Sequence, residues 1–170
     1  MLAEWAAEET ARTALDEERN SSPGLRLREP GAVHIEPITF TDRVSGQVAW
    51  QADFLKIRVV NDPKKPPPTA EAKGITAKVT ISRDGHTVRE VDGRWSESEQ
   101  PIRRIMNLQT ITDLLHMDIG IGDERSIDLV AKAKADRDAY IFNNDSYLHQ
   151  PGMKKREHRL EPGEYEVRVR

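Results

Sequence analysis

The chain of 170 residues contains no cysteine, only 5% aromatic residues and no long apolar run. Without cysteine, it cannot form disulfide bonds, thiolate zinc sites or a cysteine nucleophile. No stretch approaches the roughly 20 apolar residues of a membrane-spanning helix, and the N-terminus lacks the pattern of a secretory signal. The 26 basic and 29 acidic residues leave a formal net charge of −3, without the basic excess of a nucleic-acid-binding surface. We therefore expect no nucleic-acid partner, no membrane span within the chain and, with no targeting signal, a cytoplasmic location by default.

The first 22 residues differ in composition from the rest. Residues 2–19 are rich in Ala, Glu and Arg, which favour helix, and the Pro and Gly of residues 20–24 end it. Trp5 and Leu15 are the main apolar anchors of an otherwise charged stripe. The pattern predicts an N-terminal helix over 1–22 that is either docked on the surface or a stalk. It could equally be the end of a longer helix that begins outside this chain.

From residue 25 onward, apolar and polar residues alternate with the period of a β-strand. The alternating stretches are 25–27, 33–40, 54–60, 75–81, 86–91, 126–133, 139–142 and 165–169. Asp84-Gly85 reads as a tight hairpin turn, and Pro37 makes 33–40 an edge strand or a broken one. Short strands without crossover helices predict an all-β fold over 25–170, an antiparallel sandwich of about seven to eight strands.

Alternation also assigns faces. It places Lys56 and Arg58 on the solvent side of their strand, and Asp128 on the side opposite Ile127 and Leu129.

Three segments do not fit a clean strand. Residues 61–73 hold four prolines and predict an extended, solvated loop. The apolar spacing of 102–115 suits a short helix, a packed irregular segment or a strand. Residues 143–161 are polar and predict a long surface loop.

Residues 160–165, Leu-Glu-Pro-Gly-Glu-Tyr, resemble the L-x-P-G-x-Y corner of immunoglobulin-like and fibronectin type III-like sandwiches. The resemblance implies that the Tyr165 hydroxyl bonds to backbone near residues 160–163 and pins the loop. In that superfamily the corner usually precedes the penultimate strand, whereas this chain stops at Arg170. Either 165–169 is the closing strand or the chain is part of a longer protein. The antibody-type disulfide is excluded.

The candidate metal residues lack a recognised spacing. Asp118, Asp123, Glu124 and Asp128 could supply oxygen ligands to calcium, but Arg125 lies among them and we interpret the segment as a solvated turn. The histidines show no metal-ligand spacing, and we expect His34 and His86 at the surface. These residues are His34, His86, His116, His149 and His158.

Short motifs for nucleotides or serine hydrolysis are incomplete. Gly120-Ile121-Gly122 lacks the third glycine of a dinucleotide-binding loop, and Val44-Ser45-Gly46 lacks the first glycine of a nucleophile elbow. A basic run in a predicted loop could contact an acidic partner or lipid headgroups, but we interpret it as a solvated loop tip. The run comprises Lys154, Lys155, Arg156 and Arg159.

The sequence therefore predicts a non-catalytic β-sandwich interaction or spacer module within a larger protein, without an assigned catalytic, cofactor-binding or metal site. Its expected partner is another protein or a neighbouring domain, and a homo-oligomer could form through an edge strand or the N-terminal helix. One alternative is a carbohydrate-binding module that uses exposed aromatic side chains, drawn from Trp50, Trp95, Tyr140 and Tyr147. The other is an enzyme with a loop-borne site that uses His116, His149 and Asp145.

Overall fold

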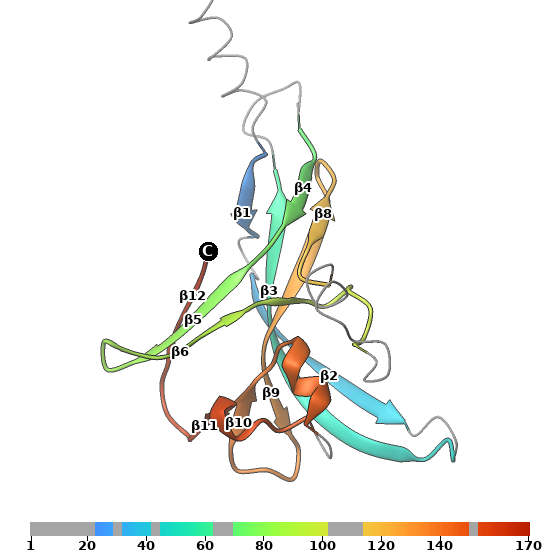
Figure 1. The fold of residues 1–170 in the computed structure, drawn as a ribbon, viewed down its shortest axis with the longest axis vertical. Coiled ribbons are helices and arrows are strands. Elements are labelled where there is room, and N and C mark those ends of the chain that lie inside the picture. The colour runs from blue at the N-terminus through green and yellow to red at the C-terminus, as the bar shows by residue number, and fades with distance from the viewer. Residues whose placement is uncertain (1–22, 29–31, 42–44, 63–69, 102–113, 150–152) are drawn as a thin grey trace, which may run out of the picture.

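A computed structural model of the chain describes residues 23–28, 32–41, 45–62, 70–101, 114–149 and 153–170 (Figure 1). The all-β prediction is confirmed, because the described strands pair antiparallel in three sheets. The predicted helix over 1–22, the prolines of 61–73 and most of 102–115 lie outside the described residues.

The largest sheet, sheet A, has seven strands in the order β1-β3-β9-β10-β11, with β2 also paired to β3 and β7 also paired to β9. Its strands are β1 (Leu25–Leu27), β2 (Val33–Thr41), β3 (Val48–Asn61), β7 (Arg94–Trp95), β9 (Glu124–Ala133), β10 (Ala139–Ile141) and β11 (Arg159–Leu160). Pro37 lies in β2, which pairs with β3 alone among the described strands. The edge position expected from this proline is confirmed.

Two smaller sheets complete the fold. Sheet C has the order β12-β5-β6, from β12 (Glu166–Val169), β5 (Lys78–Arg83) and β6 (His86–Asp92). Asp84 and Gly85 join β5 to β6 with φ values of 52° and 77°. A two-residue hairpin turn needs positive φ values at both positions to match the right-handed twist of the strands that it joins. Sheet B pairs β4 (Ala72–Ile75) with β8 (Met117–Ile119).

The main hydrophobic core lies between sheets A and C. Trp95, Ile127 and Leu129 from sheet A pack with Val79 and Ile81 from sheet C, each no more than 2% exposed. Gly93 lies where the chain passes from β6 to β7. A Cβ atom there would come within 3.0 Å of Ala77 and 3.2 Å of Ile127. Gly93 therefore lies at a crossing between the two sheets, where a side chain would be crowded by the core.

A second core covers the opposite face of sheet A. Phe54 and Phe142 meet edge to face at 4.7 Å between ring centroids, with Ala52 and Ala131 beside them. The described part of 143–161 forms two 3-10 helices, η1 (Asn144–Leu148) and η2 (Arg156–His158), and strand β11, and its residues Tyr147 and Met153 pack against this core. The surface loop predicted for this segment is wrong, because its short polar side chains are buried by bonding to backbone, as Ser146 does.

The alternation pattern also predicted one strand where the structure has two. The stretch 75–81 was expected to be one strand, but β4 ends at Ile75 in sheet B and β5 begins at Lys78 in sheet C. The backbone changes sheet between them, a change that alternation alone does not show.

A bulge in β9 changes the predicted faces of the residues that follow Leu129, so that Val130 shares a face with Leu55 and Ala131 shares one with Phe54. The register passes from Leu55–Val130 to Lys56–Asp128, so Leu129 is the extra residue. Asp128 lies on the side opposite Ile127, as alternation predicts, and this is the face of the second core, where Lys56 also lies, only 6% exposed. The solvent position predicted for Lys56 is therefore wrong.

Asp128 is at the centre of a buried charge network that links neighbouring strands of sheet A. Its carboxylate accepts a hydrogen bond from the Ser96 hydroxyl at 2.7 Å and pairs with Lys56 at 3.5 Å and Arg94 at 3.6 Å. Lys56 also pairs with Glu36 at 2.7 Å. The Arg94 guanidinium donates to Asn144 Oδ1 at 2.7 Å and to the Ser98 carbonyl at 2.8 Å. Each buried charge is thus compensated, as burial requires.

Asp128→Asn is expected to lower the free energy of unfolding by about 3 kcal/mol or more, because Arg94 and Lys56 would remain buried without their shared carboxylate. Asp92→Asn is the matched control, since Asp92 pairs with Lys78 at the surface, and its loss should be much smaller. Urea unfolding of both variants measures the difference, and equal losses would contradict the importance of the network.

Candidate functional site

Four large apolar side chains lie exposed on the core-facing side of sheet A. They are Leu25, Leu27, Val33 and Ile35, and we call them the open strip. Val33 is paired with Ile57 and Ile35 with Leu55, and residues directly opposite on neighbouring strands point to the same face. Yet Val33 is 57% and Ile35 67% exposed. The face that forms the core therefore continues past the core into solvent.

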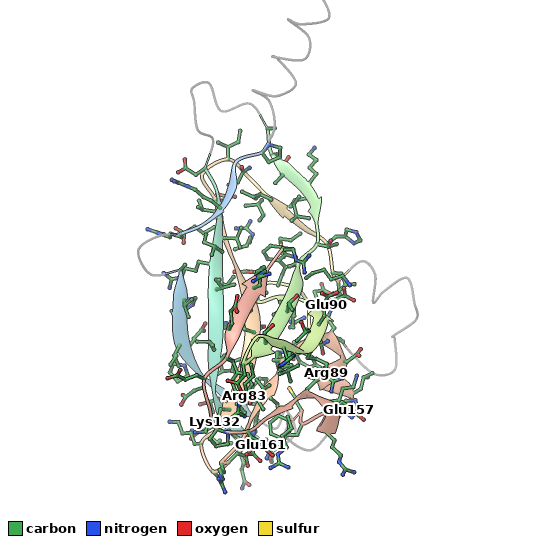
Figure 2. All side chains as sticks on the ribbon, turned by 90° about the vertical axis from the view of Figure 1, so that its left-hand side faces the viewer. Arg83, Arg89, Glu90, Lys132, Glu157 and Glu161 are labelled. Atoms are coloured by element: carbon green, nitrogen blue, oxygen red, sulfur yellow. The ribbon has the colours of Figure 1, made fainter. Side chains whose placement is uncertain are left out.

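The open strip is exposed because sheet C is narrower than sheet A. Its three strands lie over β9 and part of β3, and β12 is the strand of sheet C that comes nearest to β1, since Val169 and Leu27 line one groove. β12 is an edge strand of sheet C, since β5 lies between it and β6. Figure 2 shows β5 and β6 on one flank of β12, and β2 and β3 beyond the other.

Two apolar grooves follow β12 on this side. The Tyr165 groove, with a volume of about 370 Å³, lies between Tyr165 and Val167 of sheet C and Leu55 and Val130 of sheet A. The Trp95 groove, about 300 Å³, lies between Val169 and Leu27 above the buried Trp95. Leu25 and Leu27 of the open strip line the Trp95 groove, and Leu55, the strand partner of Ile35, lines the Tyr165 groove, so the strip adjoins both grooves.

Basic side chains predominate around the two grooves. Lys132 and Arg137 line the Tyr165 groove together with Glu161, and Arg26 and Arg170 line the Trp95 groove. Figure 2 shows Lys132, Glu161 and Arg83 near one another at the end of the molecule where the Tyr165 groove opens. Neither Lys132 nor Arg137 forms an ion pair with another described residue, whereas Arg26 is paired with Asp62.

The corner that begins β12 has the hydrogen bond that the motif implied. The Tyr165 hydroxyl donates to the Glu161 carbonyl at 2.9 Å, and the Arg83 guanidinium lies over the Tyr165 ring at 5.5 Å from its centroid. The hydrogen bond and the Arg83 contact fix the residues that lead into β12, next to β5. Glu161 and Tyr165 also line the Tyr165 groove.

A separate polar pocket of about 520 Å³ lies beside β6 at the other edge of sheet C. Arg89, Glu90 and Asp92 form one wall, and the opposite wall comes from residues 143–158, including Lys155 and His158. Figure 2 shows Arg89, Glu90 and Glu157 together on this flank. Burial lowers the pKa of His158, and the charge of Lys155 lowers it further.

The predicted calcium ligands each bond elsewhere. The Asp118 carboxylate accepts from the Gly74 amide at 2.7 Å, Asp123 and Glu124 pair with Arg125 and Arg28, and Asp128 belongs to the buried network. No group of three or more metal-ligating side chains occurs in the part of the chain that the structure describes. Gly120 and Gly122 form the turn between β8 and β9.

The aromatic residues considered for sugar binding are mostly packed. Trp95 is 1% exposed and donates to the carbonyls of Ile75 and Leu115. Trp50 stacks on Phe40 at 4.8 Å and Tyr147 packs on Phe142 at 5.4 Å. Trp95 therefore cannot line an open sheet face.

The three residues considered for a loop-borne enzyme share no described pocket. Asp145 lines the polar pocket and pairs with Lys155 at 3.1 Å, but neither His116 nor His149 lines it. His34 is half-buried rather than fully at the surface, while His86 is exposed as expected.

The basic run is largely paired with aspartates of the β9–β10 connection and of η1. Lys154 contacts Asp136 at 2.6 Å, Lys155 contacts Asp145 at 3.1 Å and Arg159 contacts Asp138 at 2.7 Å. These pairs fasten the segment over the second core.

Sequence reasoning identified the strands of the open strip but not its exposure. The available signal was the alternation of Leu25 and Leu27 with Arg26 and Arg28, which predicts a half-buried strand. Only the width of sheet C decides whether that apolar side is covered.

Comparisons with protein-family models, curated proteins and solved structures gave no significant match to this chain. Among its described residues, no helix has the length and apolar character needed to cross a bilayer.

His158 is expected to make stability depend on pH. Because its pKa is lowered in the folded chain, the unfolded chain takes up the proton more readily, and stability falls as the pH drops below about 6.5. Urea unfolding between about pH 7.5 and pH 5.5 should show a smaller loss for His158→Gln than for the wild type. The exposed His86→Gln is the control and should follow the wild type. Identical curves for all three proteins would refute this role of His158.

Proposed function

We propose that residues 25–170 form an immunoglobulin-like β-sandwich that serves as a non-catalytic interaction module and binds another polypeptide through the open strip. The sandwich assignment is supported by two sheets facing one core and by the Tyr165 hydrogen bond to Glu161. The observation that carries the function is the exposure of Val33 and Ile35 on a core face. Contiguous exposed apolar surface with a polar rim is typical of interaction sites.

The remaining features support binding over catalysis. The buried charges of the Asp128 network are paired with one another and with carbonyl and amide groups, which is the arrangement expected of a structural cluster. The two grooves beside β12 are lined mainly by apolar side chains, and such surfaces favour burial of a partner's side chains.

Ile35→Lys is expected to remove partner binding, because it places a charge in the middle of the proposed contact. Ile35 is 67% exposed, so the variant should keep the wild-type thermal transition. Val88→Lys is the matched control, since Val88 is also an exposed apolar residue but lies on β6. The measurement is quantitative affinity purification of the full-length protein from its own cells.

The expected result is a stoichiometric polypeptide that is recovered with the wild type and Val88→Lys but lost with Ile35→Lys. The same recovered proteins for all three would overturn the proposed surface. Turnover in a broad hydrolase screen, or a stoichiometric bound metal, would overturn the non-catalytic assignment.

A further inference from the structure

The outer edge of β12 presents unpaired backbone groups. Arg170 and Lys78 exchange both backbone hydrogen bonds, at 3.0 and 2.8 Å. Hydrogen-bonded pairs alternate along an antiparallel ladder, so Arg168 also bonds to β5, opposite Thr80. The amides and carbonyls of Val167 and Val169 therefore point away from β5. Among the described strands, none pairs with this edge.

From this edge and the open strip we infer that the module binds an extended, acidic segment of a partner protein, which adds antiparallel to β12 as a fourth strand of sheet C. The inference rests on the proposed function and specifies its partner. Strand addition supplies backbone hydrogen bonds along the edge and side-chain contacts at every second residue. All pairings between described strands are antiparallel, and the added strand continues that pattern.

The open strip and the two grooves fit the inner side of such a strand. Neighbouring strands lie about 4.8 Å apart, which carries the added strand from β12 over the open strip. Its residues opposite Val167 and Val169 point toward sheet A, one into the Tyr165 groove and the next into the Trp95 groove. Alternate residues of a strand are about 6.6 to 6.8 Å apart, so two apolar side chains enter two successive grooves.

The charges favour an acidic outer side. The solvent face of β12 carries Arg168 and Arg170, which pair with Glu166 at 2.9 Å and with Glu90 of β6 at 3.8 Å, all at exposed positions. Exposed pairs of this kind are weak, so both arginines can also pair with carboxylates of an added strand, and cross-strand pairs of opposite charge stabilise a sheet. Lys132 and Arg137, which form no ion pair with another described residue, add positive charge at the Tyr165 groove.

The same charges disfavour a second copy of this chain as the occupant. In two antiparallel β12 strands, the register that uses both valines of each strand places Arg168 directly opposite its own equivalent. Like charges directly opposite each other destabilise a sheet. A partner with acidic residues in those positions avoids this repulsion.

The probe is a fluorescent peptide of roughly eight residues with alternating valine and glutamate, long enough to span β12. Amide hydrogen exchange followed by NMR reports the edge directly. In the free chain, the Val167 and Val169 amides should exchange rapidly while the Arg168 amide is protected. Addition of the peptide should protect both valine amides by about tenfold or more, as a backbone hydrogen bond does.

Two modified peptides provide the matched controls without changing the chain. In an antiparallel pairing, the peptide residues opposite Val167 and Val169 donate and accept the hydrogen bonds. Methylation of the valine nitrogens should therefore lower the affinity by about tenfold or more, whereas methylation of the glutamate nitrogens should not.

A peptide with lysine in place of glutamate should bind more weakly. Val167→Pro, which removes an outward amide without breaking a bond to β5, should also weaken binding.

The outcomes separate this inference from the proposed function. Equal binding of both methylated peptides, or no saturable binding of the glutamate peptide, would overturn strand addition even if Ile35→Lys still abolished capture of a partner. Equal binding of the lysine peptide would overturn the acidic partner. Protection of Val167 and Val169 that grows with chain concentration in the absence of peptide would mean that a second copy occupies the edge.

Discussion

The pairing of β3 with β9 is the interaction on which the other described elements depend. β1 and β2 pair with one edge of β3, and β7 and β10 pair with the far edge of β9. Both faces of this central pair are buried, one under sheet C and the other against Phe142, Tyr147 and Met153.

The difference in width between sheets A and C has two consequences, and both occur beside β12. A seven-stranded sheet that faces a three-stranded one leaves part of its apolar face exposed, and the outer edge of β12 pairs with none of the described strands. Exposed apolar surface and a free strand edge each favour association with other chains. Here they adjoin, since Val169 of the edge strand and Leu27 of the exposed strip share the Trp95 groove.

Local features of the fold could be predicted from the sequence, and features that depend on distant pairing could not. The alternation of β2, β3, β6 and β9, the turn at Asp84-Gly85 and the Tyr165 hydrogen bond follow from neighbouring residues. The division of 72–83 between two sheets depends on Met117 and Ile119, far along the chain. Burial of Lys56 depends on Asp128 and Glu36 in other strands.

The candidate site shows the same limit. Leu27 and Ile35 have the alternation of ordinary half-buried strand residues. What makes them notable is that no described strand covers them, and nothing in the residues near them in sequence specifies how many strands sheet C contains.

The Tyr165 corner also affects the entropy of any association at β12. The hydroxyl bond to Glu161 and the Arg83 contact fix the first residues of the strand within the folded chain. The conformational freedom of these residues is therefore lost during folding rather than at the moment of encounter. A pre-ordered edge reduces the ordering penalty of association, so most of that penalty would fall on the incoming segment.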